Sequence, residues 1–193
     1  MKRTHCRRSF PTLGKALLLP LWAAWGAAAV VPSSVAADAF RPDAAGFRAA
    51  TSTTDSKDLD QAMAFVSWNL PWHWTWGSWT AVPRLDTAAG ALSGKGGNGF
   101  SGSVGPALTL QLRAKPAVFF DLGVSPTYLG KHEFEDVNLG GSFQFTSHIG
   151  VGARFGRDRR IGIAYRLQHI SNASIYNQNP GVEMHVLEVG LRF

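Results

Sequence analysis

Hydrophobic and polar residues alternate with a period of two along most of the second half of the chain. In residues 101–113 one face carries valine, proline and leucine, and the other carries mainly small and polar residues. The same alternation runs through residues 117–129 and 141–155. Because successive side chains of a β-strand point to opposite faces, this pattern predicts strands with one apolar and one polar face.

The composition of the polar face separates two architectures that both fit this alternation. A soluble sandwich turns its apolar faces inward, whereas a membrane barrel turns them outward to the lipid. Each polar face here holds a charged or large polar residue among small ones, as a narrow lumen filled with side chains requires. We therefore predict an all-β protein that forms an antiparallel transmembrane β-barrel.

Eight strands are predicted, at residues 45–54, 61–70, 79–93, 101–113, 117–129, 141–155, 160–171 and 182–193. Eight is an even number and the smallest common size of an outer-membrane barrel. Tight turns alternate with longer polar loops, among them the glycine-rich segment 94–99, which we interpret as a flexible extracellular loop. Barrels of this type have short periplasmic turns, so both termini are expected on the periplasmic side.

Aromatic residues mark the ends of the predicted barrel. Residues 68–79, WNLPWHWTWGSW, fall at a periplasmic turn, where tryptophans suit the girdle at a membrane interface. The alternative, that they are core aromatics, would overfill a small interior. The chain ends on Phe193, which falls on the same face of its strand as the outward apolar residues. A terminal aromatic residue at this position resembles the C-terminal assembly signature of outer-membrane barrels.

The first 37 residues have the three parts of a secretory signal peptide. A basic start is followed by an apolar stretch of about 16 residues, shorter than the roughly 20 of a spanning helix, and then by small residues. We expect residues 1–37 to be removed and residues 38–193 to form the outer-membrane β-barrel domain.

Removal of that segment changes the charge and the available chemistry. It takes five of the 19 basic residues and none of the 13 acidic ones, so the net charge falls from +6 to +1. Nucleic-acid binding through overall basicity is thereby excluded. Cys6, the only cysteine, also leaves, which excludes disulfides and thiol chemistry.

Residues 168–183, QHISNASIYNQNPGVE, join the last two predicted strands and are rich in side chains that carry chemistry. By the alternation rule, His169 and Ser171 continue the outward, lipid-facing side of their strand. On the closing strand Glu183 lies outward, whereas Glu188 and Arg192 point into the lumen.

The hairpin geometry lines up three of these side chains. A symmetric hairpin centred near residue 176 places His169 opposite Glu183, with Cβ atoms about 4.5–5.5 Å apart, and Ser171 lies roughly 6.5–7 Å along the strand. A serine hydroxyl needs an imidazole to accept its proton and a carboxylate to orient that imidazole. The order Ser-His-Glu predicts a hydrolase; the alternative is a polar rim that meets lipid headgroups.

This segment resembles the signature of the outer-membrane lipid A 3-O-deacylases, the PagL family. The family pattern is a histidine, one residue, Ser-Asn, a loop with another asparagine and a glycine, and an acid fourteen positions after the histidine. By this resemblance Ser171 is the nucleophile, His169 the general base and Glu183 its orienting partner.

The resemblance also implies donors for the oxyanion of the tetrahedral intermediate. Asn172 and Asn179 fall at the family's asparagine positions and are the candidates, together with backbone N–H groups after Ala173. The family often places a glycine just after Ser-Asn, whereas this chain reads Ala173-Ser174. The backbone part of the oxyanion hole is therefore open.

The predicted function is hydrolysis of the ester at the 3 position of lipid A in the bacterial outer membrane, with no metal or cofactor. Lipopolysaccharide and outer-membrane lipids are the expected partners, nucleic acid is not, and a homodimer is left open. The histidines lack metal-ligand spacing. His185 lies two residues after Glu183 on the same outer face, and we expect it either to contact a lipid headgroup or to have no role in the reaction.

Two other functions are considered. An outer-membrane phospholipase also carries His-x-Ser on a lipid-facing strand, but its family uses an asparagine as third member, calcium and a larger barrel. A non-enzymatic barrel for adhesion or structural support would carry the same residues as rim decoration only.

Overall fold

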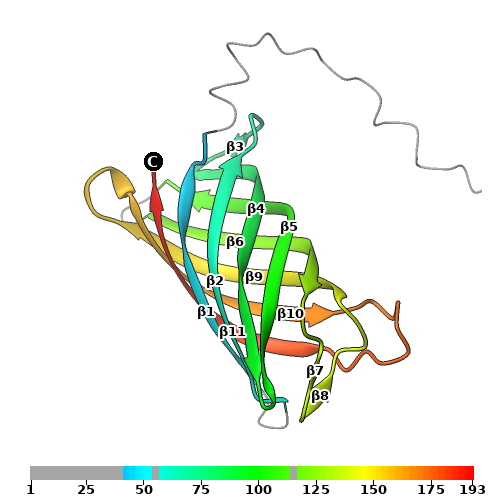
Figure 1. Cartoon of the computed structure of the whole chain (residues 1–193). Coiled ribbons are helices and arrows are strands. Elements are labelled where there is room, and N and C mark those ends of the chain that lie inside the picture. The colour runs from blue at the N-terminus through cyan, green and yellow to red at the C-terminus, as the bar shows by residue number, and fades with distance from the viewer. Residues whose placement is uncertain (1–40, 54–56, 114–116) are drawn as a thin grey trace, which may run out of the picture.

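The structure, a computed structural model, describes residues 41–53, 57–113 and 117–193, so the predicted signal peptide lies outside the described residues. Eight long antiparallel strands close into a barrel (Figure 1). They are β1 (Ala44–Ser52), β2 (Leu59–Asn69), β4 (Trp79–Gly94), β5 (Gly97–Leu112), β6 (Ala117–Leu129), β9 (Phe143–Phe155), β10 (Ile161–Ser171) and β11 (Val182–Arg192). The first strand, β1, pairs with β2 and also with the last strand, β11, and β2 pairs with β4. The ring of eight strands is therefore closed and has no free edge.

The eight strands predicted from the alternation are confirmed, but one connection is wrong. The segment 94–99 is not a long loop, since only Lys95 and Gly96 separate β4 from β5. Gly96 and Gly97 have φ angles of 88° and 120°. Side chains rarely tolerate such angles, so the glycines allow the strands to turn back within two residues.

In the part of the chain that the structure describes, three short strands and the 3-10 turn between β9 and β10 lie outside the barrel wall and are not predicted by the alternation. They are β3 (Trp74–Trp76), β7 (Glu133–Phe134), β8 (Val137–Asn138) and η2 (Arg157–Arg159). Trp72, Trp74 and Trp76 are 51–60% exposed, so the alternative that they are core aromatics is wrong. Among the described residues, no helix is long and apolar enough to cross a membrane.

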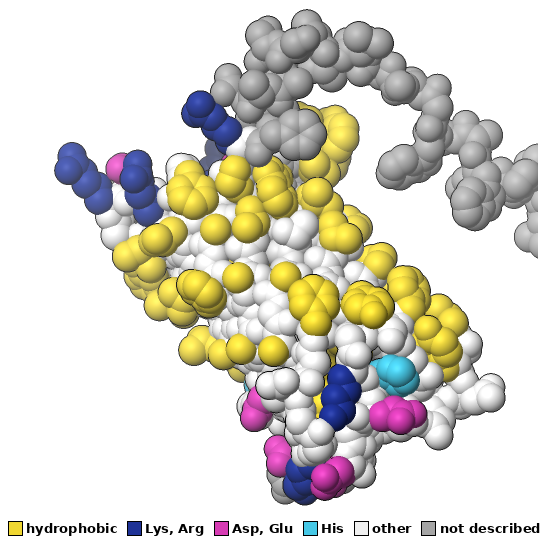
Figure 2. All heavy atoms as spheres, in the orientation of Figure 1, with side chains coloured by type: hydrophobic (Ala, Val, Ile, Leu, Met, Phe, Trp, Pro, Cys, Tyr) yellow, Lys and Arg dark blue, Asp and Glu magenta, His cyan; other side chains and the backbone are white. Residues whose placement is uncertain are grey.

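The barrel wall is apolar on the outside and polar on the inside. Figure 2 shows hydrophobic side chains over the wall, with charged side chains gathered at the two ends. Large apolar residues exposed on the wall include Leu85, Val104, Phe120, Leu122, Val124, Ile149, Val151, Ile163, Leu167, Leu187 and Val189. This is the reverse of a soluble protein and the arrangement of a transmembrane barrel.

Paired charges fill the middle of the lumen. The network comprises Arg48, Arg84, Arg166, Asp86, Asp121 and Glu188. Arg166, only 2% exposed, lies 2.6 Å from Asp121 and 2.7 Å from Glu188. The lumen position predicted for Glu188 is confirmed. Since each buried charge has an opposite partner, the interior is a packed polar core rather than a channel.

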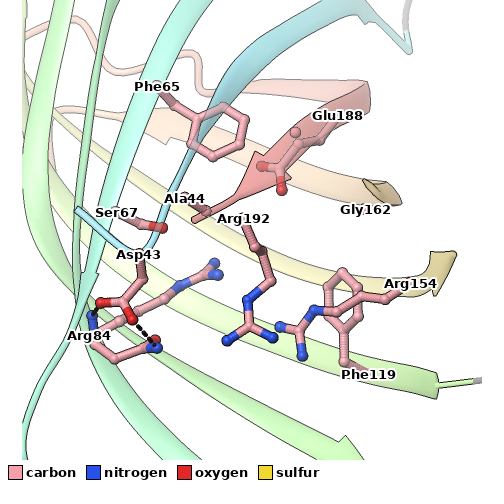
Figure 3. A pocket seen from close by; sticks show the side chains of 12 residues that line it. Asp43, Ala44, Phe65, Ser67, Arg84, Phe119, Arg154, Gly162, Glu188 and Arg192 are labelled. Carbon is pink, nitrogen blue, oxygen red and sulfur yellow. Dashed lines mark hydrogen bonds between the residues drawn. The ribbon is translucent and has the colours of Figure 1, made fainter. Parts of the chain in front are cut away.

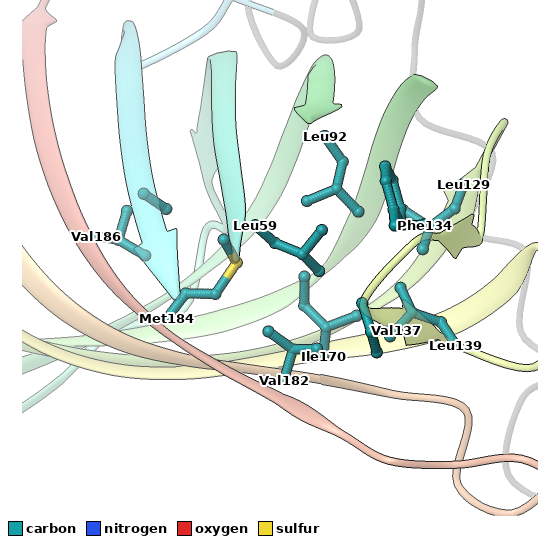
Figure 4. Packing of buried hydrophobic residues seen from close by; sticks show 11 residues of the cluster. Leu59, Leu92, Leu129, Phe134, Val137, Leu139, Ile170, Val182, Met184 and Val186 are labelled. Carbon is teal, nitrogen blue, oxygen red and sulfur yellow. The ribbon is translucent and has the colours of Figure 1, made fainter. Parts of the chain in front are cut away.

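An apolar cluster closes the lumen at the end opposite the termini (Figure 4). Its members are Ala50, Leu59, Leu92, Leu129, Phe134, Val137, Leu139, Ile170, Val182, Met184 and Val186, and we call this set the apolar cap. The β7–β8 hairpin contributes Phe134 and Val137, and β10 and β11 contribute their inward residues. The cap therefore packs directly behind the ends of β10 and β11, where the candidate site lies.

Candidate active site

His169 and Glu183 lie opposite each other on β10 and β11, as the symmetric hairpin predicts. The imidazole Nδ1 and the carboxylate Oε1 are 2.6 Å apart. The side chains are 41% and 60% exposed, on the same outer face as Leu167 and Leu187. A carboxylate at Nδ1 orients the imidazole and leaves Nε2 as the nitrogen that can exchange a proton with a substrate or nucleophile.

Ser171 is the last residue of β10 and lies two positions beyond His169, on the same side of the strand. It is half-buried. Among the described residues, no hydrogen bond joins Ser171 to His169. Nucleophile and base are often separated before substrate binds and move together in the complex, so this spacing is compatible with catalysis.

The side chain of Asn172 points into the barrel, opposite to the outward side chains of His169 and Ser171. It is fully buried, and its side-chain amide donates hydrogen bonds to the carbonyls of Leu139 and Gln178, at 2.9 and 2.6 Å. Its backbone N–H donates to Oδ1 of the exposed Asn179, at 3.0 Å. Asn172 thus ties the loop after β10 to the loop before β9. The oxyanion roles expected for Asn172 and Asn179 stay predictions.

The chain turns sharply directly after Asn172. Ala173 and Ser174 have φ angles of 50° and 63°, and the N–H of Ile175 donates to the carbonyl of Asn172 at 3.0 Å. Consecutive residues in a turn of this kind direct their N–H groups to one side, which favours an anion there. Both residues are exposed, next to Ser171.

Gly181 and Lys57 hold the other side of the loop against the imidazole. A Cβ at Gly181 would lie 2.9 Å from His169 Cε1, and the residue has a φ of 59°. Lys57 Nζ donates to the carbonyls of Pro180 and Gly181, at 2.8 and 2.6 Å. Sequence reasoning assigned neither residue a role, although a glycine in this loop is part of the family pattern. The Pro-Gly pair signals a turn, whereas nothing local marks a lysine 124 positions away.

Tyr165 and His185 form a second polar pair on the outer wall, nearer the middle of the barrel than the His169–Glu183 pair. Their rings stack with centroids 5.8 Å apart, and the Tyr165 hydroxyl is hydrogen-bonded to His185 Nδ1. His185 therefore has a partner within the protein itself.

The outer wall of this transmembrane barrel carries a hydrogen-bonded imidazole–carboxylate pair with a serine hydroxyl nearby. This arrangement belongs to the class of outer-membrane enzymes. Such groups on a lipid-facing surface can act on a substrate embedded in the same membrane. The model of the family described as lipid A 3-O-deacylase (PagL) matches residues 62–192. The chain belongs to this family.

Two curated relatives and one solved structure are similar to this chain. A lipid A deacylase PagL from Bordetella bronchiseptica is 35% identical over 75 residues, which cover 39% of this chain and 41% of the relative. One from Pseudomonas aeruginosa is 30% identical over 128 residues, covering 61% and 72%. A crystal structure described as the outer membrane enzyme PagL aligns with a TM-score of 0.65 and 21% identity, over 76% of this chain and 99% of that one.

Proposed function

We propose that the protein is a lipid A 3-O-deacylase of the outer membrane, which hydrolyses the ester that links a 3-hydroxyacyl chain to the 3 position of lipid A. The observation that carries this proposal is the 2.6 Å contact between His169 and Glu183 on the outer wall, two residues from Ser171. Family membership supports the same activity.

In the proposed mechanism Ser171 Oγ attacks the ester carbonyl carbon and its proton passes to His169 Nε2. Glu183 stabilises the imidazolium. The bond to the sugar oxygen then breaks, and that oxygen takes the proton from His169. A water molecule attacks the resulting acyl-serine, again with His169 as base, and a free 3-hydroxy fatty acid leaves as Ser171 regains its proton.

The oxyanion needs donors close to Ser171. The backbone N–H groups of Ala173 and Ser174 follow it directly, in the turn with positive φ. The amide nitrogen of Asn179 is a further candidate, because its Oδ1 is the atom that accepts from Asn172. The side-chain nitrogen of Asn172 is engaged with two carbonyls, so we favour the backbone groups and Asn179.

An exterior site suits a membrane-embedded substrate. The outward residues next to the site, Leu167 on β10 and Leu187 on β11, are apolar and exposed. The acyl chains of a lipid can lie against this wall while its ester sits at the depth of His169. Binding then requires no enclosed pocket, because the bilayer already desolvates and orients the substrate.

The reaction is tested by incubating the purified protein with lipopolysaccharide and weighing the lipid A by mass spectrometry. The expected result is loss of one hydroxyacyl group. An unchanged lipid A mass with fatty acid released from phospholipid would instead indicate a phospholipase. An absence of any release would indicate the non-enzymatic barrel.

We also propose that export removes residues 1–37, since the basic, apolar and small-residue parts occur in the order of a signal peptide. The protein recovered from outer membranes is then expected to begin at Asp38. N-terminal sequencing measures this, and retention of Met1 would refute it.

Gly181→Ala is expected to lower the turnover number for lipid A by about 10- to 100-fold. A methyl group 2.9 Å from His169 Cε1 would displace the imidazole, and small displacements of catalytic groups cost rates of this order. Gly77→Ala is the matched control: its φ of 54° is similar, but no atom of the other described residues, its chain neighbours aside, lies within 4 Å of the added Cβ. Equal losses in both variants would refute the positioning role of Gly181.

Lys57→Met is expected to lower the turnover number about two- to tenfold, with little change in KM. The variant removes two charge-assisted hydrogen bonds to the carbonyls of Pro180 and Gly181, in the loop that contacts His169. Lys57→Arg should retain part of the rate. Lys131→Met is the control, since Lys131 binds the carbonyl of Gly96 in the same way, on the β4–β5 turn. Steady-state kinetics that show the same loss in both Met variants would contradict this role.

A further inference from the structure

A cavity opens at the end of the barrel that carries the termini, which is the periplasmic end in barrels of this class. Figure 3 shows the guanidinium groups of Arg84, Arg154 and Arg192 pointing toward one another in this cavity. Its volume is about 40 Å³, room for about three water-sized groups. That space matches the oxygens of a small oxyanion rather than a whole lipid.

The charges of Arg154 and Arg192 are not balanced by the lumen network. In that network three arginines face three acids, so it is neutral by itself. Among the described residues, neither Arg154 nor Arg192 forms an ion pair with a carboxylate. Three arginines and two acids line the cavity, so it carries surplus positive charge.

The two carboxylates that line the cavity are already engaged. Asp43 accepts hydrogen bonds from the backbone and side-chain nitrogens of Asn69, at 2.6 and 2.8 Å. Glu188 accepts from Arg48 at 2.7 Å and lies 2.7 Å from Arg166. Both oxygens of Asp43 and Oε2 of Glu188 are therefore engaged with partners other than Arg154 and Arg192.

The remaining geometry orients guanidinium groups for an oxyanion. Arg154 lies over the ring of Phe119, 4.7 Å from its centroid, so its face is covered, and among the described residues its N–H groups have no hydrogen-bond partner. Arg84 is 8% exposed, and its Nη2 binds Asp121, whereas its buried Nε has no hydrogen-bond partner within residues 41–53, 57–113 and 117–193. Planar guanidinium groups with free edges match phosphate oxygens.

The rim of the same end is also basic. The described residues there include Arg41, Arg113, Arg157, Arg159 and Arg160, against Asp43 and Asp158. A surface potential of one sign raises the local concentration of oppositely charged solutes. Anions in the periplasm are thus drawn toward the cavity mouth.

We propose that this cavity is a binding site for a phosphate group, held by Arg154 and Arg192 with Arg84 behind them. The phosphate comes from inorganic phosphate in the periplasm or from the headgroup of a phospholipid in the inner leaflet. The site lies at the opposite end of the barrel from His169, so it is separate from the proposed esterase and does not depend on it.

Isothermal titration of the mature protein in zwitterionic detergent tests this site, with inorganic phosphate and short-chain phosphatidylglycerol as separate probes at constant ionic strength. Arg154→Gln/Arg192→Gln is expected to weaken binding by about tenfold or more, because charge-assisted hydrogen bonds are lost. Lys95→Gln/Lys131→Gln removes the same charge at the β4–β5 turn, at the opposite end of the barrel, and should change binding less than about twofold. Migration on unheated gels checks that each variant is folded.

Each outcome has one meaning. Binding of inorganic phosphate that only the cavity variant loses supports the site with a free anion. Binding of the lipid probe alone, again lost only in the cavity variant, supports the site with a headgroup. Equal losses in the two double variants, or no binding of either probe to the unmodified protein, overturn the proposal.

Discussion

Replacing Ser171 with alanine is expected to lower the rate of lipid A deacylation by about 10⁴-fold or more. Without the hydroxyl no acyl-serine forms, and the His169–Glu183 pair alone can only activate water. Losses of a nucleophile in Ser-His-acid hydrolases are of this order, and the residual rate comes from substrate binding and oxyanion contacts. A time course of lipid A masses measures the rate.

Ser174→Ala is the matched control, because Ser174 is the other serine of the same loop, exposed and three positions further along. Its side chain should be dispensable, and its backbone N–H is retained in the variant. If Ser174→Ala abolished the reaction and Ser171→Ala did not, the nucleophile would be assigned to the wrong serine. Release of the same hydroxyacyl group at the unmodified rate by both variants would refute the assignment of Ser171 as the nucleophile.

The alternation predicts the barrel well because the information is local. Each strand lies between lipid and lumen, so every second residue must be apolar, and the same rule places His169 outward and Glu188 inward. The pairing of His169 with Glu183 also follows, since a hairpin with equal arms leaves only one register.

The parts that escape prediction depend on contacts between distant segments. The cap combines residues from β1, β2, β4, β6, β10, β11 and the β7–β8 hairpin. Lys57 Nζ donates to the Gly181 carbonyl across 124 positions. Asn172 illustrates the limit: its even position in the alternation indicates an inward side chain, but only the structure shows that it binds the Leu139 carbonyl. Short elements such as β7 have too few residues to show a period.

These distant contacts connect the interior to the outer wall. Polar groups held on a lipid-facing surface need rigid support, because a loose strand end would let them reorient toward water. The cap supplies that support through Ile170 and Val182, which alternate with His169, Ser171 and Glu183 along β10 and β11. Below the cap the lumen network holds the strands together.

Asp121→Ala is expected to destabilise the barrel by about 3 to 5 kcal/mol. Asp121 is fully buried and contacts Arg84 at 2.8 Å and Arg166 at 2.6 Å. Its removal leaves the buried Arg84 guanidinium without its carboxylate partner and takes from Arg166 one of its two close carboxylates, so that Glu188 remains. Uncompensated buried charge of this kind costs much more than the pair itself contributes. Urea unfolding in lipid vesicles, followed by tryptophan fluorescence, measures the free energy of unfolding.

The control is Asp136→Ala, which breaks an ion pair of similar length, 2.8 Å, but at the surface: Lys95 and Asp136 are 55% and 27% exposed. Water replaces the lost partner there, so the free energy of unfolding should scarcely change. If the two variants unfolded alike, the lumen would have to be hydrated enough to solvate Arg84 and Arg166. The barrel would then owe its stability to strand pairing and the apolar cap rather than to its buried charges.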